Sequence, residues 1–313
     1  MKIIFLGTPA FAVGSLQKLI DSKHNVIAVV TQPDKPSGRG NKIVPCEVKV
    51  CAQQNGIPVY QFDKIGRDGV DVLSKLKPDI MITVAYGQIL TQQIIDIPKY
   101  GIINVHGSLL PKYRGASPIQ TAIMKGEKET GITIMQTDIG LDTGDMLSMQ
   151  KIAIDEADTA ETLGRKLAQL GADMLLDVLD DIQAGNVTRV KQNHSDATFT
   201  KKIHKHDCNI NWQKSSTQIK CLIMGANPDP VANTMLNGGL VKIYTASVVN
   251  NIELNDQYEV GEILPNSSVK TGVFVKCGSG VIKLGQMQLP GGKVLEATQL
   301  LNGRKIKVGD ILV

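Results

Sequence analysis

An asparagine and a histidine two positions apart are the first residues of the sequence that could do chemistry together. Asn104 and His106 end a short β-rich run, Gly101–His106, and an extended backbone would place both side chains on the same side. A carboxamide and an imidazole side by side can donate hydrogen bonds to one oxygen that becomes negative during a reaction. The pair alone leaves another interpretation open, a polar strand end whose histidine bonds to a backbone carbonyl.

Two nearby segments favour an active site. Ser108–Arg114 (SLLPKYR) predicts a turn directly after the pair, and Asp138–Asp145 (DIGLDTGD) predicts a sharp acidic turn further along the chain. The second turn can present Asp142 beside His106, where a carboxylate would fix the tautomer of the imidazole and stabilise its charged form. A calcium loop, the competing interpretation, needs more ligands at regular spacing and a distal Glu.

The elements that must position these residues predict an α/β domain. Near-continuous apolar strands alternate with helical patterns, which is typical of a mostly parallel, Rossmann-like sheet covered by helices on both faces. The expected strands are Lys2–Gly7, Asn25–Gln32, Asp79–Ala85, Gly101–His106, Thr130–Thr137 and Met146–Ile154, and the expected helices are Phe11–Ser22, Cys46–Gln54, Gly66–Leu76, Pro118–Lys125 and Asp158–Gln183. Ligands of such sheets bind beyond the carboxyl ends of the strands, where Asn104 and His106 lie. The turn after the first strand has only the first glycine of G-x-G-x-x-G, so NAD binding is not supported.

The pattern of apolar and turn residues changes after the long helix, which predicts a second domain. Gly185–Lys205 loses periodicity and is interpreted as an interdomain linker, with a catalytic domain over 1–203 and a C-terminal domain over 204–313. Trp212 is expected in the packed core of the C-terminal domain. β-rich runs separated by Gly, Asn, Ser and Pro predict a small β-barrel. These runs are Leu240–Val248, Val260–Leu264, Gly272–Cys277, Val281–Leu289 and Ile306–Leu312.

Length and composition limit the possible classes of protein. With 313 residues and a hydrophobic share of 42%, the chain can form two domains with their own cores. It has no apolar run long enough to span a membrane, and its first apolar run is too short for a signal peptide, so a cytoplasmic protein is expected. The five cysteines form no C-x-x-C pair, so reduced thiols and no metal are expected. The net charge of +4 decides nothing about partners by itself.

A basic loop between the second strand and the second helix is the main candidate for contact with a polyanion. Pro33–Val44 contains Lys35, Arg39 and Lys42 among glycines and prolines, and almost no apolar side chains. Such a segment cannot bury enough surface to become ordered by itself. It could become ordered on a phosphate backbone, where Arg39 would offer a planar fork of donors. A solvated connection is the alternative.

The two candidate segments together resemble a known family. NVHGSLLPKYRGASPIQ, which begins at Asn104, and DIGLDTGDM, which begins at Asp138, resemble the signature of the folate-dependent formyltransferases. These enzymes use 10-formyltetrahydrofolate to formylate an amine. The likeness extends to FLGTPAFAVGSLQKLI near the start, to TQPDKPSGRGNKIVPCEVK, and to LNGRK near the end of the chain. It therefore covers nearly the whole sequence and points to the branch of the family that formylates methionyl-initiator tRNA for translation initiation.

The resemblance implies roles for individual residues. Asn104 and His106 would polarise the formyl oxygen, and Asp142 would orient His106 and help to move protons. A C-terminal barrel of the oligonucleotide-binding (OB-like) type and the residues Lys35, Arg39 and Lys42 would contact tRNA, although Asn41 replaces a second basic residue that is common in that loop. A monomer without a metal is expected. The folate cleft would be lined by Ala85, Tyr86, Gly87, Gln88, Ile89, Leu90, Ser108, Leu109, Leu110, Pro111 and Asp138.

Two other functions remain possible from the sequence alone. A purine-pathway formyltransferase that acts on glycinamide ribonucleotide would share the three catalytic residues, but it would need neither the basic loop nor a second domain. A non-enzymatic RNA-binding protein would use the loop and the C-terminal domain. It would have no reason to bring Asn104, His106 and Asp142 together.

Overall fold

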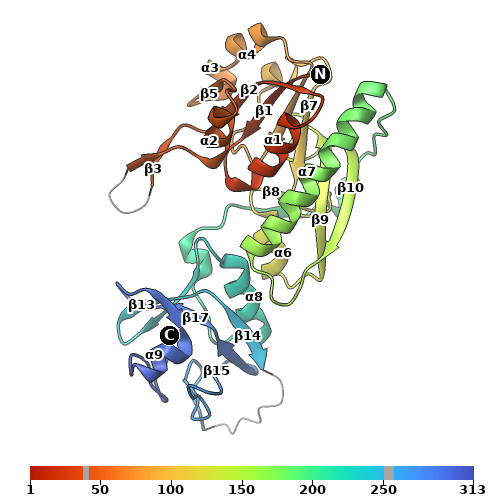
Figure 1. The fold of residues 1–313 in the computed structure, drawn as a ribbon. Helices are drawn as coiled ribbons and strands as arrows, with labels where there is room; N and C mark the ends of the chain where they lie inside the picture. Colours follow the sequence, from red (N-terminus) through yellow and green to blue (C-terminus); the bar gives the residue numbers. More distant parts are fainter. Residues whose placement is uncertain (38–41, 250–256) are drawn as a thin grey trace. The chain divides into compact units, whose positions relative to one another are not determined.

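The chain divides into two compact units. The computed structural model describes residues 1–37, 42–249 and 257–313 (Figure 1). The first unit comprises Met1–Pro118, Thr130–Ile152 and Gly164–Thr200, and the second comprises Ile119–Glu129, Ala153–Leu163 and Lys201–Val313. The second unit thus also includes two short segments that precede its main part. The domain boundary after residue 203 stays a prediction.

A large, mostly parallel sheet forms the centre of the first unit. Strand β7 runs parallel to β6 and antiparallel to β9, and β1 is parallel to both of its neighbours. This arrangement confirms the predicted α/β class. In spatial order the strands are β10 (Met146–Ala153), β9 (Glu129–Gln136), β7 (Ile102–His106), β6 (Ile80–Val84), β1 (Lys2–Gly7), β2 (Asn25–Thr31) and β5 (Val59–Gln61).

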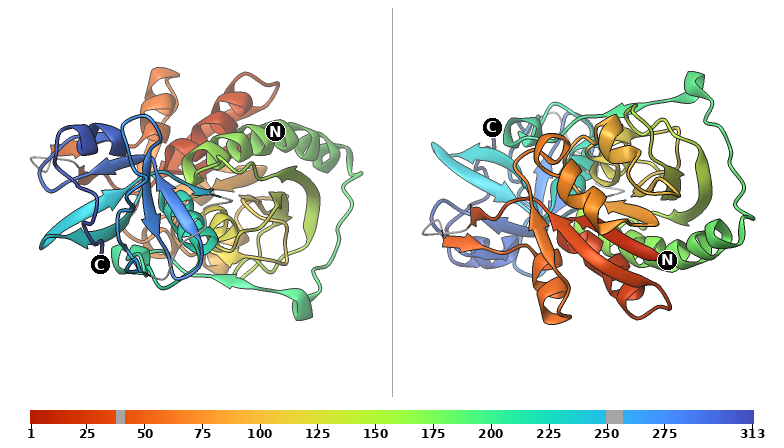
Figure 2. Two further views of the ribbon diagram at one scale, coloured as in Figure 1. Left: turned by 90° about the horizontal axis from the view of Figure 1, so that it is seen from below. Right: turned by 90° about the horizontal axis from the view of Figure 1, so that it is seen from above.

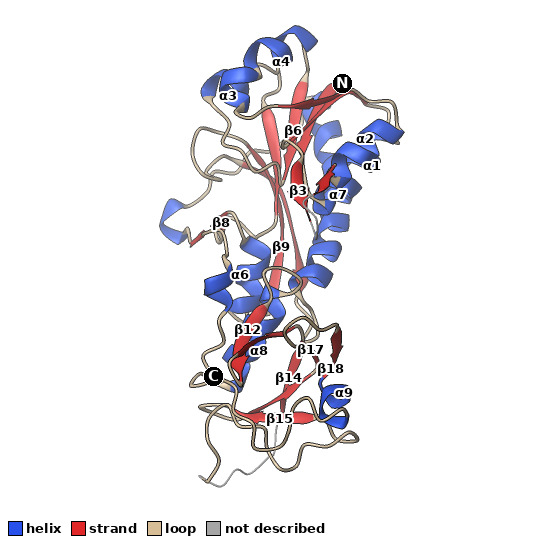
Figure 3. Cartoon of the chain, turned by 90° about the vertical axis from the view of Figure 1, so that its left-hand side faces the viewer, coloured by secondary structure: helices blue, strands red, loops and turns tan. Residues whose placement is uncertain are grey.

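Helices cover both faces of this sheet because its strands are apolar on both sides. Helices α1, α2 and α7 lie together on one face (Figure 3). On the other face Ile4 and Leu6 of β1 pack in one core with Ile65, Leu73 and Ile94, which belong to α3, α4 and α5. The helices are η1 (Ala10–Ala12), α1 (Val13–Ile20), α2 (Glu47–Gln54), α3 (Ile65–Asp68), α4 (Val70–Leu76), α5 (Gln92–Ile95) and α7 (Ala160–Ala184).

A glycine in α7 fixes which way the residues of β7 point. A Cβ atom at Gly171 would lie 2.7 Å from Cγ1 of Val105, so only a glycine lets the helix backbone come this close to the strand. The side chain of Val105 therefore faces α7. Because side chains alternate along a strand, Asn104 and His106 on either side of Val105 face away from this helix.

The basic loop differs from its prediction. Strand β3 (Lys35–Ser37) pairs antiparallel with β4 (Lys42–Val44), so the arms of the loop form a short hairpin. Pairing of this kind satisfies backbone hydrogen-bonding groups without a hydrophobic core, which is why a composition poor in apolar residues did not prevent it. Arg39 lies outside the described residues.

The second unit is a small β domain, as predicted, and helices also pack on it. One antiparallel sheet has the order β12-β13-β17-β18, and another has the order β14-β16-β15. Trp212 is buried in the core of this unit, as expected, and its Nε1 donates a hydrogen bond to Thr234 Oγ1 at 2.9 Å. The elements are α6 (Pro118–Met124), η3 (Lys205–Cys208), α8 (Ser216–Ala226), β12 (Ala232–Leu236), β13 (Gly239–Ile243), β14 (Ala246–Val249), β15 (Val273–Lys276), β16 (Val281–Leu284), β17 (Gln286–Gln288), β18 (Val294–Glu296) and α9 (Ala297–Asn302).

The segment that follows α7 was predicted as a linker but packs on the first unit as far as Thr200. It can be followed in Figure 2 from the end of α7 past β10, where Val190 and Met146 form a bridge. It then forms η2 (His194–Asp196) and β11 (Phe199–Thr200), which pairs with β8 (Arg114–Gly115). We call residues 189–200 the strap.

Candidate active site

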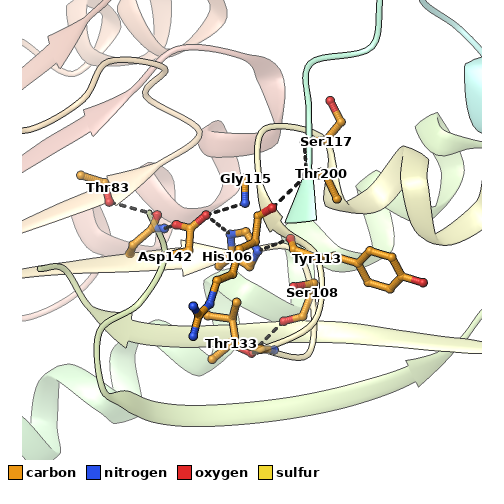
Figure 4. Close-up of polar contacts among 12 residues, drawn as sticks. Thr83, His106, Ser108, Tyr113, Gly115, Ser117, Thr133, Asp142 and Thr200 are labelled. Atoms are coloured by element: carbon orange, nitrogen blue, oxygen red, sulfur yellow. Dashed lines mark hydrogen bonds and ion pairs between the residues drawn. The ribbon is translucent and has the colours of Figure 1, made fainter. Parts of the chain in front are cut away.

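The carboxamide of Asn104 is oriented by the neighbouring strand. Thr83 of β6 is labelled in Figure 4. Its Oγ1 donates a hydrogen bond to Asn104 Oδ1 at 3.0 Å, so the carbonyl end of the amide points toward β6. The amide nitrogen lies 3.4 Å from Asp142 Oδ1, to which it donates. An amide nitrogen carries two protons. Its second N–H has no partner within the part of the chain that the structure describes and can bind a substrate oxygen.

His106 is buried, and its tautomer is set by a backbone carbonyl. Its Nε2 lies 3.0 Å from the carbonyl oxygen of Tyr113. A carbonyl oxygen can only accept, so Nε2 carries the proton of the neutral ring and Nδ1 is unprotonated. Nδ1 faces the carboxylate of Asp142, with 3.7 Å between Nδ1 and Oδ2. We expected Asp142 to fix the tautomer of His106, but the carbonyl of Tyr113 fixes it. From the sequence, a bond to a backbone carbonyl and a neighbouring carboxylate are alternatives, and the structure has both.

The protonation of His106 follows from its surroundings. Burial lowers the pKa of His106 below its ordinary value, because a charged imidazolium is poorly solvated there. The Asp142 carboxylate and the Tyr113 carbonyl act in the opposite direction and raise the pKa in part. The resting imidazole is therefore neutral at neutral pH, with a lone pair on Nδ1 that can accept a proton next to a carboxylate.

Asp142 occupies a sharp turn and itself has a left-handed backbone conformation. Its φ angle is +51°, a conformation that residues with a side chain rarely adopt. The carboxylate accepts a hydrogen bond from the backbone N–H of Gly115 at 2.8 Å. Gly115 must be a glycine, because its φ is +111° and a Cβ atom there would lie 2.3 Å from the carbonyl oxygen of Thr200. These contacts place the carboxylate between Asn104 and His106, whereas the sequence predicted only a position beside His106.

The turn after β7 is fixed by hydroxyl groups rather than by secondary structure. Ser108 Oγ donates to the carbonyl of Lys112 at 2.6 Å. Thr133 Oγ1 in β9 donates to the carbonyl of Ser108 at 2.7 Å and accepts from Leu110 N–H at 3.1 Å. Ser108 and Leu110 are buried, whereas Leu109 and Pro111 are partly exposed. Of the four residues predicted to line a folate cleft here, only the latter two expose surface to a ligand.

The loop after β6 divides into anchoring and exposed residues. Tyr86 and Leu90 are buried, and burial raises the pKa of Tyr86 to about 12. Gln88 anchors the loop, because it accepts from Ile65 N–H and donates to the carbonyl of Phe62, both at 2.8 Å. The residues of this loop that are exposed at the carboxyl end of the sheet are Ala85, Gly87 and Ile89.

Asp138 begins the acidic turn and binds within it. Its carboxylate accepts hydrogen bonds from Thr143 Oγ1 at 2.7 Å and from Gly140 N–H at 3.1 Å. A hollow of about 530 Å³ lies beside this turn. Its lining includes Asp138 and Gln192 but neither Asn104 nor His106, so it is distinct from the space in front of these two residues.

The remaining predicted residues belong to the basic loop. Lys35 lies on β3 and is exposed, and Lys42 begins β4. In the described ranges no group of three or more His, Cys, Asp or Glu side chains is arranged to hold a metal ion. No helix within those ranges is long and apolar enough to cross a membrane.

Three residues that the structure places around the site were not predicted from the sequence. Thr83 orients Asn104, Tyr113 fixes the tautomer of His106, and Gln192 on the strap contacts the turn that carries Asp142. A threonine at the end of β6, at the same level as Asn104 in β7, could have been found from the strand alignment. Gln192 could not, because nothing local distinguishes it from the surrounding polar residues.

Comparison with known proteins assigns the chain to a family. A family model described as Formyl transferase matches residues 1–179, and one described as Formyl transferase, C-terminal domain, matches residues 202–305. Methionyl-tRNA formyltransferase of Geobacter metallireducens is 44% identical over 310 residues, covering 99% of this chain and 97% of its own. The same-named protein of Acetivibrio thermocellus is 44% identical over 313 residues, covering 100% and 99%. The chain therefore belongs to the methionyl-tRNA formyltransferase family.

A solved structure agrees at the level of the fold. The N-formyltransferase from Helicobacter canadensis, determined with folinic acid and dTDP-3-aminofucose, aligns with a TM-score of 0.67 at 22% identity. The alignment covers 91% of this chain and 98% of that one. At this identity the likeness shows a common fold for the two proteins.

Proposed function

We propose that the protein transfers the formyl group of 10-formyltetrahydrofolate to the α-amino group of methionyl-initiator tRNA in the cytoplasm, for translation initiation. The observation that carries this proposal is the convergence of Asn104, His106 and Asp142 at the carboxyl end of the parallel sheet, in a chain 44% identical over its length to curated methionyl-tRNA formyltransferases. The Helicobacter canadensis structure, determined with folinic acid, supports a folate as the formyl donor.

The attacking group needs little activation. A free α-amino group titrates near ~7.7–8.0, and esterification of the adjacent carboxyl lowers this value further. Much of the amine is therefore neutral at the pH of the cell. The barrier lies in the tetrahedral intermediate that forms when the amine nitrogen attacks the formyl carbon and the formyl oxygen becomes negative.

Asn104 is placed to stabilise that oxygen. Its amide is held by Thr83 on one side and directed toward Asp142 on the other, which leaves one N–H for the oxyanion. A donor that is already oriented does not have to reorganise as charge develops, and removal of one such donor typically costs about 10²–10³ in rate.

His106 and Asp142 are placed to move the proton. As the new C–N bond forms, the amine loses a proton to Nδ1 of the neutral imidazole, and Asp142 stabilises the resulting imidazolium across 3.7 Å. The same proton then passes to N10 of tetrahydrofolate as its bond to the formyl carbon breaks. The charged Nδ1–H of His106 can also donate to the oxyanion until the intermediate collapses.

The substrates would bind on surfaces that the structure leaves open. The folate would lie beside the exposed residues Ala85, Gly87 and Ile89 and beside Leu109 and Pro111. The tRNA would contact the basic loop and the second unit. The loop residues in this role would be Lys35, Arg39 and Lys42.

One assay tests this function against the alternatives. Purified protein is incubated with 10-formyltetrahydrofolate and either methionyl-initiator tRNA or glycinamide ribonucleotide, and formyl transfer is measured. We expect formylation of the tRNA alone. Transfer to the ribonucleotide alone would indicate a purine-pathway enzyme, and binding of tRNA without any transfer would indicate a binding protein.

A further inference from the structure

We infer that Gln192, on the strap, is a positioning residue that holds the Asp142 turn in its catalytic conformation. This inference rests on the proposed function, because it concerns the reaction in which Asp142 takes part. Gln192 is buried, with 6% of its surface exposed, although it lies in a segment whose neighbours are largely exposed. A buried carboxamide requires partners for both of its ends.

The partners of Gln192 are the backbone of the catalytic turn and a buried cation. Its Nε2 donates to the carbonyl of Asp142 at 2.9 Å and to the carbonyl of Gly144 at 2.8 Å. Its Oε1 accepts from Nη2 and Nε of Arg114 at 2.6 and 3.1 Å. One side chain thus donates to two carbonyls of the acidic turn and also accepts from the guanidinium of Arg114, the residue before Gly115.

The turn needs such a clamp because its own backbone is unfavourable. Asp142 has a φ of +51°, and residues other than glycine lose stability in this conformation unless surrounding contacts fix it. Gly144 sits against β9, where a Cβ atom would lie 1.8 Å from the carbonyl of Gln136. The two hydrogen bonds from Gln192 hold the carbonyls of Asp142 and Gly144, on both sides of this close contact. The direction of the Asp142 carboxylate therefore depends on these two bonds.

The clamp also connects the two loops that meet at the carboxylate. Gly115, which donates to Asp142 Oδ2, directly follows Arg114, which is only 2% exposed. Further along the strap, Thr198 Oγ1 accepts from Tyr113 N–H at 2.8 Å, and Tyr113 is the residue whose carbonyl fixes His106. Through Gln192 the strap therefore holds the turn that carries Asp142. Through Thr198 it holds the Tyr113–Gly115 loop, which contacts both Asp142 and His106.

Two substitutions separate these contacts. Gln192→Met is similar in size and removes all four hydrogen bonds. Gln192→Glu keeps acceptors for Arg114 and pairs its charge, but it cannot donate to the carbonyls of Asp142 and Gly144. Asn193→Ala is the matched control, because among the described residues the side chain of Asn193 bonds only to Asp196 and Ser195 in its own turn.

The test measures kcat and KM for formylation of methionyl-initiator tRNA in full-length variants, well below their melting temperatures. We expect kcat to fall about 10- to 100-fold in both Gln192 variants, the scale of a misplaced catalytic group, with little change in either KM and none in Asn193→Ala. On an Asp142→Asn background Gln192→Met should cause no further loss of kcat, because the two residues act through the same carboxylate. Near-normal kcat in Gln192→Glu, or additive losses in the double variant, would overturn the inference.

A second measurement does not depend on activity. In protein labelled at the histidine ring carbons, the NMR titration of His106 should move to lower pH in Gln192→Met, as it should in Asp142→Asn, since a displaced carboxylate no longer raises the pKa of His106. An unchanged titration in Gln192→Met would refute the positioning role. If the wild-type protein does not formylate tRNA, the proposed function fails, and this titration alone decides whether Gln192 positions Asp142.

Discussion

The charge of Asp142 can be removed with almost no change in shape by Asp142→Asn. The oxygen of the new amide can still accept the hydrogen bond from Gly115 N–H, so the turn should keep its anchor. What is lost is the negative charge opposite His106, together with the acceptor for the Asn104 amide, because a nitrogen takes the place of Oδ1. At a separation of 3.7 Å and an effective dielectric constant of ~20, a full ion pair is worth about 4 kcal/mol. This energy is available only after His106 has accepted the proton, that is, in the transition state and the intermediate.

The expected loss follows directly from that energy. Each 1.36 kcal/mol in the barrier is a factor of ten in rate, so kcat should fall by roughly 10³. KM for both substrates should change little, because the ground state contains a neutral imidazole. The assay is steady-state formylation of methionyl-initiator tRNA, together with thermal unfolding of each variant.

The matched control is Asp145→Asn, which removes a carboxylate from the same turn. Asp145 pairs with Lys191 at 3.7 Å and contacts neither His106 nor Asn104. We expect this variant to retain normal kcat and a normal melting temperature. If Asp142→Asn retained kcat within tenfold of the wild type, the carboxylate would not be stabilising a charged His106, and the proton-transfer role derived above would be wrong.

Three further predictions concern the fragment 1–203, the basic loop and the pH dependence of stability. The fragment 1–203 should fold and bind a tetrahydrofolate analogue in calorimetry. It should melt at a lower temperature than the full chain, because Met124 of α6 packs on the core of the second unit and would become exposed. A fragment that does not bind would show that the cleft needs the second unit. Arg39→Ala should lower kcat/KM for tRNA and reduce the salt dependence by about one phosphate contact, with folate Kd unchanged; equal formylation across a salt series would make the loop a solvated connection. Burial lowers the folded-state pKa of His106 below the unfolded value of ~6.5, so the unfolded chain binds the proton first. The stability of the fold should therefore decrease as pH falls below ~6.5. Tm measured against decreasing pH should fall less steeply in His106→Asn than in the wild type.

The parts of the site that could be predicted depend on local geometry. Alternation along β7 placed Asn104 and His106 on one side, and the structure shows why this holds, since Val105 between them packs on α7. The glycines of the acidic turn predicted a sharp reversal that presents Asp142. Both inferences use rules that act over a few residues, and both agree with the structure.

Contacts between distant segments could not be predicted in the same way. Gln192 is 50 residues from Asp142 and 78 from Arg114 along the chain, and its surroundings are polar and aperiodic. Polar, aperiodic sequence is typical of linkers, which is why the sequence predicts a linker over Gly185–Lys205, the segment that contains the strap. The bond from His106 to the carbonyl of Tyr113 likewise involves a backbone atom, whose position depends on the turn conformation rather than on residue type.

In the second unit, the sequence predicted the class of structure better than its elements. Leu240–Val248 was expected as one strand but is two, because the chain passes from one sheet to the other after Ile243. Helix α8 was missed, although Ser215 and Gln218 form a capping box at its start, and this pair is visible in the sequence as a helix signal.

The position of the strap in the chain also determines when the active site can be completed during synthesis. A nascent chain that has emerged only as far as α7 already contains Asn104, His106 and Asp142, but not Gln192, Thr198 or Thr200. Because a chain folds from its N-terminus as it leaves the ribosome, the sheet and its helices can assemble first. The hydrogen bonds by which the strap holds the acidic turn and the Tyr113–Gly115 loop form only once the strap has followed. A ribosome that stalls before residue 192 would therefore carry Asn104, His106 and Asp142 while the acidic turn still lacks its two hydrogen bonds from Gln192.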